Sequence, residues 1–389
     1  MKRENIYFEG LALVEGHFSG IGQYILGVLK GIDSVIERDK LAGKETPNVY
    51  VVIPYDTVAR FKSFNFKNID YKTVPFSFHI MSGLWHRDKM PPLDVFCGKG
   101  FYIFTRFVGM PLLFSKSALI IYDISFELFR EHSDERNAIF LSKGIKKYMQ
   151  KAEKVITISE NAKKEIVEHY GVSGRKVVVA TPAVDPAIFY KRSNKEVAKV
   201  KKKYGIDGDY ILTLSNLEPR KNLDGLVEAY CSLPKNVTDK TSLLLVGVNG
   251  WKTEELFEKI VQKVEKGYKI IRPSHYVSDK DKAAIISGAK LLVYPSHYEG
   301  FGMPPLEALA CGTPVITADN SSLPEAVGSA GKMVPSTSKE LLADAIAQGL
   351  DDNDKISNKI AIDGPKQAEK FSWQKSAEIF MDLAKGTKK

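Results

Sequence analysis

Short apolar segments of strand length alternate with helical patterns along nearly the whole chain of 389 residues. Apolar runs of about four to eight residues are typical of strands buried on both faces, and helices between them are typical of parallel sheets. The pattern predicts an α/β protein whose parallel sheets are covered by helices on both sides. The predicted strands are residues 7–14, 49–54, 94–97, 118–122, 154–158 and 176–180 in the first half, and 210–214, 243–247, 269–272, 291–294 and 314–317 in the second.

So many strand–helix units exceed one ordinary domain, and the chain length suits about two. Residues 182–208 lack strand character and carry a lysine-rich helical pattern, so we predict the domain boundary there. The C-terminal stretch 356–385 shows two helical patterns and no strand. We therefore expect two Rossmann-like domains, with residues 1–185 as the N-terminal domain, 186–208 as a linker, 209–370 as the C-terminal domain and 371–389 as a final helix.

The formal net charge of +9 at pH 7 limits the classes of partner. Nucleic acid, an anionic membrane surface and an anionic substrate can all favour a basic protein. No nucleic-acid motif surrounds the lysine clusters, which leaves solvated helix faces or a membrane surface as their interpretation. The two clusters are Lys143, Lys146, Lys147, Lys151 and Lys154, and Lys195, Lys199, Lys201, Lys202 and Lys203.

Cysteine and histidine usage argues against disulfides and against zinc. Cys97, Cys231 and Cys311 are scattered, which fits a reducing cytoplasm better than secretion. The start of the chain has no apolar signal core, and no stretch reaches the roughly 20 uncharged residues of a spanning helix. The histidines show no zinc-binding spacing, so we expect neither a metal nor another cofactor. The Asp-Gly-Asp string at 207–209 is interpreted as an interdomain loop.

The segment 299–307 carries the strongest chemical pattern of the chain. Glu299 and Glu307 lie eight positions apart and flank a glycine-containing turn and a double proline. The apolar run before them and the residues after them predict a strand, a glycine turn and a short helix. The prolines suit a first helical turn, so the amides of residues 301–303 would lie at a helix N-terminus, which favours phosphates or sugar hydroxyls. Both glutamates would face the ligand-binding edge of an open α/β sheet.

Three further loops follow predicted strands and could contact a ligand. Arg220 and Lys221, two adjacent cations, suit a diphosphate, although an exposed pair that caps a loop explains the dipeptide alone. The loop 272–278 could hold a nucleobase through backbone groups, and ordinary loop punctuation explains it nearly as well. The loop 19–24 contains Gly22, which lets backbone approach a ligand, but it lacks the full dinucleotide fingerprint.

Taken together, these segments resemble the large family of retaining glycosyltransferases with the GT-B fold, which includes bacterial mannosyl- and rhamnosyltransferases of surface polysaccharides. The resemblance covers nearly the whole chain. It is strongest over 210–334, where the two glutamates, the Pro-Arg-Lys-Asn segment and the Tyr-Val-Ser loop occur in family order. It implies two Rossmann-like domains that face a cleft, with the helix 371–389 returning to the N-terminal domain. The implied activity is metal-independent sugar transfer from a nucleotide-diphosphate donor, with retained configuration.

The resemblance also implies roles for single residues. Arg220 and Lys221 match the cations that bind the donor diphosphate. Glu299 matches the group that binds the donor-sugar hydroxyls, and Glu307 matches the ribose partner. The implied catalytic residues are Glu299, Arg220, Lys221 and Asp123. The other implied donor contacts are Gly22, Asn216, Tyr276, Val277, Gly300, Phe301, Gly302, Met303 and Leu306, and the residues implied near the acceptor or the sugar are Tyr122, Asp123 and His17.

Two departures from the family pattern bear on the donor. Asn216 stands where many relatives have an arginine, so the diphosphate would rest on Arg220 and Lys221. Tyr122 stands where many relatives have a histidine associated with the 6-hydroxyl of the donor sugar. A 6-deoxy sugar has no such hydroxyl, and an unpaired buried polar group costs roughly 1–3 kcal/mol. We therefore expect L-rhamnose from dTDP-rhamnose, with mannose from GDP-mannose as the alternative.

The implied acceptor is a hydroxyl of a lipid-linked oligosaccharide in capsule or other surface-polysaccharide synthesis. Aromatic residues in 56–92 and 96–114, with the basic helix near Lys146 and Lys147, favour peripheral contact with the cytoplasmic membrane face. Core packing accounts for most of these aromatics. Rival interpretations are a sugar-nucleotide epimerase or soluble disaccharide synthase on the same fold, and a non-catalytic nucleotide-sugar-binding subunit. The presence of both cations and both glutamates argues against the last.

Overall fold

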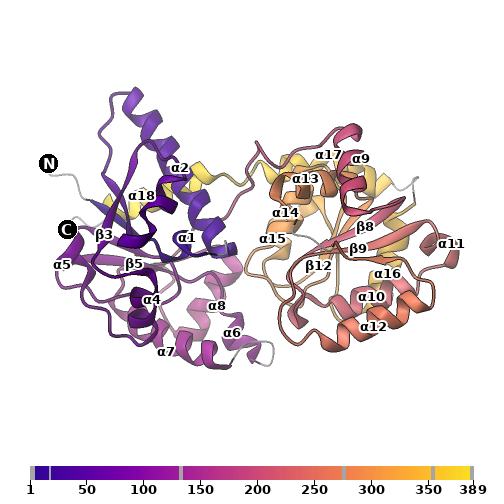
Figure 1. The fold of residues 1–389 in the computed structure, drawn as a ribbon, viewed down its shortest axis with the longest axis horizontal. Helices are drawn as coiled ribbons and strands as arrows, with labels where there is room; N and C mark the ends of the chain where they lie inside the picture. Colours follow the sequence, from indigo (N-terminus) through magenta and orange to yellow (C-terminus); the bar gives the residue numbers. More distant parts are fainter. Residues whose placement is uncertain (1–4, 17–18, 131–134, 274–276, 352–354, 386–389) are drawn as a thin grey trace. The chain divides into compact units, whose positions relative to one another are not determined.

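The computed structural model describes residues 5–16, 19–130, 135–273, 277–351 and 355–385, which form two compact units (Figure 1). The first unit contains the described residues up to Pro182 and again from Ser372, and the second unit runs from Ala183 to Phe371. Each unit is a parallel sheet with helices on both faces. The predicted α/β class with two Rossmann-like sheets is therefore confirmed.

Within its described residues, the first unit is built on seven parallel strands in the order β3-β2-β1-β4-β5-β6-β7. After β3 the chain crosses back past β1 to form β4, so the strand order reverses between β1 and β4. Such a switch point is where open α/β sheets bind ligands, at the carboxyl ends of the strands. The strands are β1 (Ile6–Glu9), β2 (Val49–Pro54), β3 (Ile69–Val74), β4 (Phe101–Phe104), β5 (Lys116–Ile120), β6 (Lys154–Thr157) and β7 (Val177–Val179).

Two buried apolar clusters, one on each face of this sheet, form the core of the first unit. Alternate residues of β1 divide between them, with Ile6 and Phe8 in one cluster and Tyr7 in the other, because strand side chains point to opposite faces in turn. The helices that cover the faces are α1 (Leu11–Val14), α2 (Gly20–Leu41), α3 (Val58–Lys62), α4 (Phe78–His86), α5 (Leu93–Cys97), α6 (Ser125–Leu128), α7 (Glu135–Lys151), α8 (Glu160–Tyr170) and α18 (Trp373–Lys385), with a 3₁₀ turn η1 (Tyr55–Thr57).

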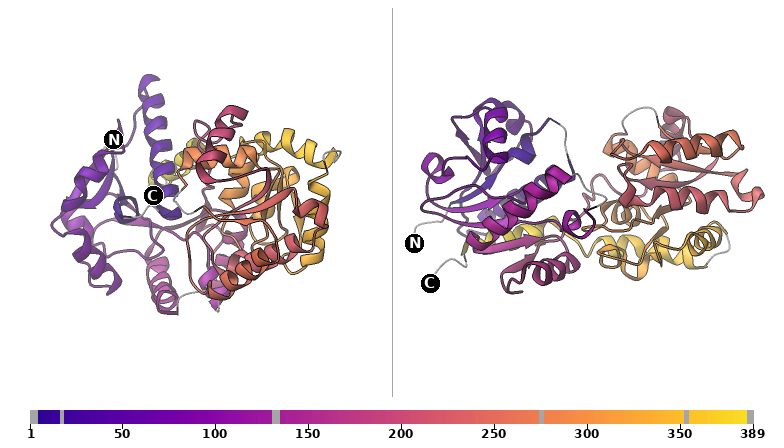
Figure 2. Two further views of the ribbon diagram at one scale, coloured as in Figure 1. Left: turned by 45° about the vertical axis from the view of Figure 1, so that its right-hand side comes forward. Right: turned by 90° about the horizontal axis from the view of Figure 1, so that it is seen from below.

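The C-terminal helix α18 belongs to the first unit and packs along α2 (Figures 1 and 2). Two glycines of α2 make this approach possible. A Cβ on Gly27 would lie 2.4 Å from the indole ring of Trp373, and a Cβ on Gly31 would lie 2.4 Å from the Trp373 carbonyl oxygen. Further along α18, the ring of Phe380 lies 5.7 Å from that of Phe8 in β1. The last helix is therefore part of the core of the first unit.

The second unit has six parallel strands among its described residues, in the order β10-β9-β8-β11-β12-β13, so its strand order reverses between β8 and β11. Its strands are β8 (Asp209–Leu214), β9 (Thr241–Val246), β10 (Ile270–Ile271), β11 (Leu291–Tyr294), β12 (Val315–Ala318) and β13 (Lys332–Val334). Its helices are α9 (Asn194–Tyr204), α10 (Leu223–Cys231), α11 (Lys235–Thr238), α12 (Glu254–Glu265), α13 (Asp279–Gly288), α14 (Met303–Ala310), α15 (Leu323–Val327), α16 (Lys339–Gly349) and α17 (Lys355–Ala368), with 3₁₀ turns η3 (Pro219–Lys221) and η4 (Gly328–Ala330).

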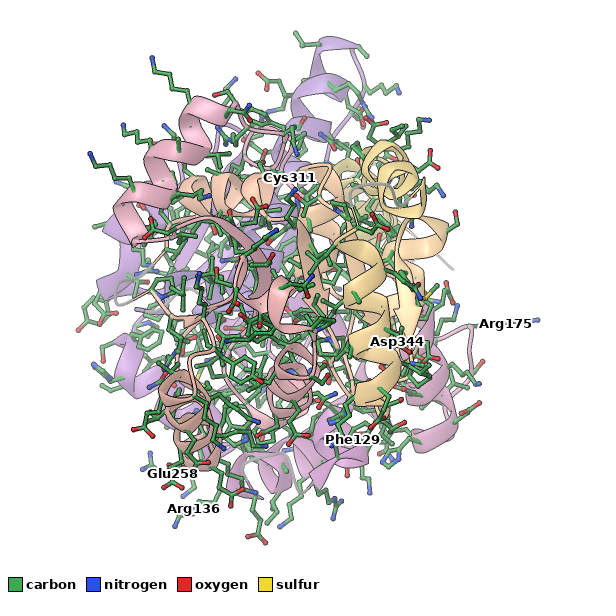
Figure 3. All side chains as sticks on the ribbon, turned by 90° about the vertical axis from the view of Figure 1, so that its right-hand side faces the viewer. Phe129, Arg136, Arg175, Glu258, Cys311 and Asp344 are labelled. Atoms are coloured by element: carbon green, nitrogen blue, oxygen red, sulfur yellow. The ribbon has the colours of Figure 1, made fainter. Side chains whose placement is uncertain are left out.

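Most charged side chains on the covering helices face solvent, whereas apolar side chains between helices and sheet are buried. Figure 3 labels Glu258 on α12 and Asp344 on α16, which are exposed, and Cys311, which is buried directly after α14. Burial raises the pKa of the Cys311 thiol to about 12. A buried thiol with a raised pKa is a packing residue and not a nucleophile.

The segment 186–208, predicted as a linker, belongs to the second unit instead. Within it, α9 begins with a capping box in which Ser193 and Glu196 bond to each other's backbone amides. Val200 of this helix is buried in the core of the unit, and the backbone amide of Arg192 donates to the Ser287 hydroxyl at 3.0 Å. These contacts fix the segment to the second unit, so it is not a free connection.

Four strand predictions differ from the structure, and one of them is the short edge strand β13 (Lys332–Val334), which was not predicted. Residues 94–97 form the helix α5, and the central strand β4 follows at Phe101–Phe104, because a short apolar run does not distinguish a strand from a buried helix. The predicted strand 7–14 ends early, since Leu11–Val14 form α1. The edge strand β3 was not predicted, and its inner residues are largely exposed, which hides the apolar signal.

Candidate active site

The turn between β11 and α14 is fixed by Gly302. Its φ of 111° lies in the left-handed region that favours glycine, and a Cβ there would lie 2.8 Å from the Leu323 Cδ2 atom. A proline occupies the first turn of α14, where no amide hydrogen is needed. The strand, glycine turn and short helix expected from the segment 299–307 are therefore all present, and the amides of residues 301–303 lie where α14 begins, at the carboxyl edge of the second sheet.

Glu299 follows β11 and is the centre of a buried ion-pair cluster. Its Oε1 atom lies 2.6 Å from the Lys221 Nζ atom, and its Oε2 atom lies 3.3 Å from the Arg220 Nη1 atom. Burial acts to raise the pKa of Glu299, but the charges of Lys221 and Arg220 outweigh it and lower the pKa to about 2. Glu299 is therefore ionised at neutral pH and can only accept hydrogen bonds.

A second carboxylate, Glu218, balances the other cation. Arg220 donates from Nη2 to the Glu218 Oε1 atom at 2.6 Å and from Nη1 to the Tyr298 carbonyl oxygen at 2.6 Å. Lys221 also donates to the Tyr294 hydroxyl at 3.1 Å. Glu218 and Lys221 are buried, so two carboxylates hold two cations in set directions with no net charge. Such a cluster is oriented before any ligand binds, which is what electrostatic catalysis requires.

Glu307 lies one turn into α14 and pairs with a lysine from α13. Its Oε1 atom lies 3.1 Å from the Lys282 Nζ atom, which also lies 3.2 Å from Asp279 and 5.0 Å from the centre of the Phe189 ring. Burial raises the pKa of Glu307, and the charge of Lys282 opposes that change. Lys282 therefore favours the ionised, hydrogen-bond-accepting form of this buried carboxylate.

The other predicted donor contacts of the second unit lie around α14, β8 and α13. Asn216 is exposed just after β8, and Val277 is half-buried just before α13. Phe301 and Leu306 are buried, and the Phe301 ring lies 5.2 Å from that of Phe371, so these two side chains serve packing. Gly300, Gly302 and Met303 form the turn and the helix start described above.

Tyr122 and Asp123 follow β5 at the carboxyl edge of the first sheet. Tyr122 is only 6% exposed, and its hydroxyl donates to the Thr105 carbonyl oxygen at 2.9 Å. The Asp123 Oδ1 atom accepts from the amide of Ser125 at 2.9 Å and from its hydroxyl at 2.7 Å. Tyr122 is thus a core residue, whereas Asp123 is half-buried and caps the following turn.

Gly22, expected in an open loop, lies in the first turn of α2, where its amide donates to the capping Ser19 hydroxyl at 3.2 Å. The remaining two predicted site residues, His17 and Tyr276, lie outside the described residues. Among the residues that are described, no group of three or more His, Cys, Asp or Glu side chains is arranged to hold a metal ion.

A buried polar cluster that the sequence did not predict lies where the strand order of the first sheet reverses. Glu9 ends β1 and accepts from the Leu11 amide and the Thr105 hydroxyl, both at 2.7 Å. Arg106 follows β4, with its Nε atom 3.9 Å from Glu9 and its guanidinium carbon 4.0 Å from the centre of the Trp85 ring. A buried cation with an incomplete set of hydrogen bonds therefore lies at this edge.

Glu218 and Lys282 complete the two ion-pair clusters, and neither was predicted. A signal for Glu218 was present, since a carboxylate two residues before two cations at a strand end suggests a counter-charge. Lys282 had no local signal, because its partner Glu307 lies 25 residues away in the sequence. Only the packing of α13 beside α14 brings the two together.

Known protein families and relatives resemble this chain in sequence. The family model described as Glycosyl transferases group 1 matches residues 195–367, which include both ion-pair clusters. O-antigen chain mannosyltransferase B of Escherichia coli is 30% identical over 281 residues, which are 72% of this chain and 71% of that protein. Serotype-specific mannosyltransferase WbdA of Escherichia coli is 28% identical over 239 residues, which are 60% of this chain and 29% of that protein.

A solved structure shows the same fold over both units. The structure of Anabaena Alr3699/HepE in complex with UDP and glucose aligns with a TM-score of 0.70 over 98% of this chain and 99% of that one, at 15% identity. The fold and the site thus define a glycosyltransferase of the GT-B class. The chain belongs to the group 1 family of glycosyltransferases, and the resemblance drawn from the segment 210–334 is confirmed.

Proposed function

We propose that this protein transfers mannose from GDP-mannose to a hydroxyl of a lipid-linked glycan in surface-polysaccharide synthesis. The cluster of Arg220, Lys221, Glu218 and Glu299 carries the proposal, because it presents two fixed cations at the carboxyl edge of the second sheet. The names of two Escherichia coli relatives support mannose, and one of them names the O-antigen chain as its product.

The 6-deoxy donor expected from Tyr122, dTDP-rhamnose, is the weaker alternative. The Tyr122 hydroxyl is bonded to Thr105, and its ring lies 5.4 Å from that of Tyr24 and 5.3 Å from that of Phe107. Because this residue packs inside the first unit, it carries no information about the 6-position of a donor sugar. The relatives named as mannosyltransferases then favour a hexose that keeps its 6-hydroxyl.

Each part of the donor has a matching group in the second unit. A diphosphate suits Arg220, Lys221 and the amides of residues 301–303 in the turn that leads into α14. Glu299, which is ionised, suits the sugar hydroxyls, since it can only accept their protons in hydrogen bonds. Glu307 suits the ribose hydroxyls in the same way, and the backbone beside Val277 suits the base.

The proposed reaction breaks the bond between the anomeric carbon and the β-phosphate oxygen, and the electron pair leaves with the nucleotide. Arg220, Lys221 and the amides of residues 301–303 would stabilise the charge that develops on that oxygen, so no metal is required. The acceptor oxygen then bonds to the anomeric carbon from the same face, which retains the configuration. The proton of the acceptor hydroxyl passes to an oxygen of the leaving phosphate.

A donor panel tests the proposal. Purified protein is given GDP-mannose, dTDP-rhamnose or UDP-glucose in EDTA, with a lipid-linked oligosaccharide as acceptor, and the product is analysed by mass and by anomeric NMR signals. We expect transfer of mannose with retained configuration, and loss of transfer in Glu299→Gln. Preferred use of dTDP-rhamnose, an inverted product or a requirement for added metal would each contradict a named part of the proposal.

A lipid-linked acceptor would place the enzyme at the cytoplasmic face of the membrane as a peripheral protein. In the ranges that the structure describes, no helix is long and apolar enough to cross a bilayer. If the acceptor is held in the bilayer, a surface feature of the folded units would supply the peripheral association.

A further inference from the structure

Four large apolar side chains are exposed on two segments of the first unit that are hydrogen-bonded to each other, the helix α5 and the loop before β5. Val95 and Phe96, on α5, are 58% and 40% exposed, and Leu113 and Phe114, in the loop before β5, are 62% and 65% exposed. We call these four residues the apolar knob. Single exposed apolar side chains are ordinary on a protein surface, but a contiguous group marks an interaction surface.

The backbone of the apolar knob is held in place by Asp94. This residue is buried, and its carboxylate accepts from the amides of Leu113 at 2.9 Å and of Phe114 at 2.6 Å. Burial acts to raise the pKa of Asp94, but these amide hydrogen bonds outweigh it and lower the pKa. The amide of Leu93 also donates to the Pro111 carbonyl oxygen at 3.0 Å. The knob is therefore a fixed feature and not a loose loop tip.

Lysines flank the apolar knob on both segments that form it. Lys99 follows α5 and Lys116 begins β5, and both are exposed. The two segments lie together, because the Gly100 amide between them donates to the Ser115 hydroxyl at 3.2 Å. The ammonium of Lys116 lies 2.9 Å from the carboxylate of Glu153, which balances its charge. This contact does not involve Lys99.

The basic helix α7 reaches the same edge of the sheet. The amide of Glu153, just after α7, donates to the Ser117 carbonyl oxygen of β5 at 2.8 Å. Tyr148 of α7 packs on Gly109, where a Cβ would lie 2.8 Å from the tyrosine ring. The exposed lysines of this helix are Lys143, Lys146, Lys147 and Lys151, of which Lys147 pairs with Asp88. The C-terminal end of α7, with its exposed Lys151, therefore adds positive charge near the segment that leads from the knob into β5.

We propose that the apolar knob and the lysines around it dock on a bilayer that contains anionic lipids. Exposed apolar side chains enter the boundary between headgroups and acyl chains, and lysines attract anionic headgroups. A second copy of this chain suits the surface less well, because a two-fold contact would bring the same lysines face to face. The proposal rests on the proposed function for its purpose, since a lipid-linked acceptor gives the enzyme a reason to bind membrane.

Vesicle flotation of the full chain tests the docking surface without donor or acceptor. We expect the protein to float with vesicles that contain phosphatidylglycerol and to bind pure phosphatidylcholine weakly. The double variant Leu113→Ser with Phe114→Ser should lower binding at least about tenfold, because it removes apolar area that enters the bilayer. Lys99→Glu should lower binding to anionic vesicles and reduce its dependence on salt.

Leu41→Ser is the matched control, since Leu41 ends α2 and is 86% exposed outside the knob, and this variant should bind as the wild type does. Equal binding to neutral and anionic vesicles, no binding at all, or unchanged binding of the double variant would each overturn the proposal. A dimer in light scattering that the double variant abolishes would assign the knob to a second copy. Transfer to a water-soluble acceptor is measured in parallel. This reaction does not need a bilayer, so its failure would count against the proposed function and not against the docking surface.

Discussion

The ammonium of Lys221 lies 2.6 Å from the carboxylate of Glu299, and both side chains are buried in the second unit. A buried ion pair contributes little net stability against an apolar replacement, yet removal of one partner is costly because it leaves an unpaired charge. The pair therefore couples two properties that can be measured separately. Its protonation state affects the stability of the unit, and its fixed charges affect the transfer reaction.

We predict that Glu299 contributes a distinct part of the acid sensitivity of the fold. Its folded pKa of about 2 lies below the ordinary value of 4.5, so its stabilisation is present above that ordinary value and is lost as pH falls toward 2. Urea unfolding at neutral pH and near about pH 3 measures this loss. Glu299→Gln should be less stable at neutral pH and should lose less stability on acidification. Parallel losses in the two proteins would exclude this role for Glu299.

Arg220→Gln should lower the turnover number by about 10²–10³, by analogy with the loss of one preorganised donor to a developing negative charge. Steady-state release of the nucleoside diphosphate measures this change. Arg38→Gln is the control, because Arg38 is an exposed surface arginine that pairs with Asp39 and Glu378. If both arginine variants retain wild-type turnover, Arg220 does not stabilise the leaving group.

Lys282→Met should weaken nucleotide binding through Glu307. Without the lysine charge, burial would raise the pKa of Glu307 further, so the protonated form, which is a weaker acceptor for ribose hydroxyls, persists to higher pH. Calorimetric titration with GDP across pH should then show the loss of affinity on acidification beginning at a higher pH in the variant.

A nucleotide without ribose hydroxyls separates this role of Lys282 from a merely structural one. Wild type and Lys282→Met should bind 2′,3′-dideoxy-GDP with similar affinity, because the group that Glu307 accepts from is absent. Lys203→Met is the matched control. Lys203 lies on α9, and its Nζ atom is 2.6 Å from the carboxylate of Asp281, which lies on α13 beside Lys282. This substitution leaves Glu307 untouched. An equal loss of affinity for both nucleotides would assign Lys282 to general packing.

Gly302→Ala should destabilise the second unit by about 1–3 kcal/mol, because alanine strains the left-handed backbone and its Cβ meets Leu323. Thermal unfolding measures the change. Gly174→Ala is the control, since a Cβ there has no neighbour within 4 Å. Equal melting temperatures for the two variants would show that the turn before α14 adjusts without cost.

Most of the fold could be predicted from the sequence, because buried parallel strands such as Leu243–Val246 of β9 are continuous apolar runs. The edge strand β3 could not, since its exposed inner residues leave no apolar run. The helix α5 was mistaken for a strand, because five residues are too few to show a helical period.

The candidate site was also predictable from the sequence only in part. The glycine turn, α14 and both glutamates follow from local sequence, because proline and glycine restrict the backbone directly. The partner of each glutamate depends on tertiary packing, as the pair of Lys282 and Glu307 shows. Tyr122 was expected in the vicinity of the acceptor or the sugar, and its side chain packs in the core of the first unit, because sequence position alone does not give the direction of a side chain.

The position of the apolar knob has a consequence for the acceptor. Leu113 and Phe114 of the knob directly precede β5, whereas ligands of open α/β sheets bind beyond the opposite ends of their strands. With about 3.3 Å per residue, strands of this length separate the two edges by roughly 15 Å. A bilayer under the knob would therefore lie at least that far from a reacting hydroxyl at the carboxyl edge. If the acceptor is lipid-linked as proposed, its glycan would have to span this height, so the depth of the first sheet would set a minimum length for the acceptor.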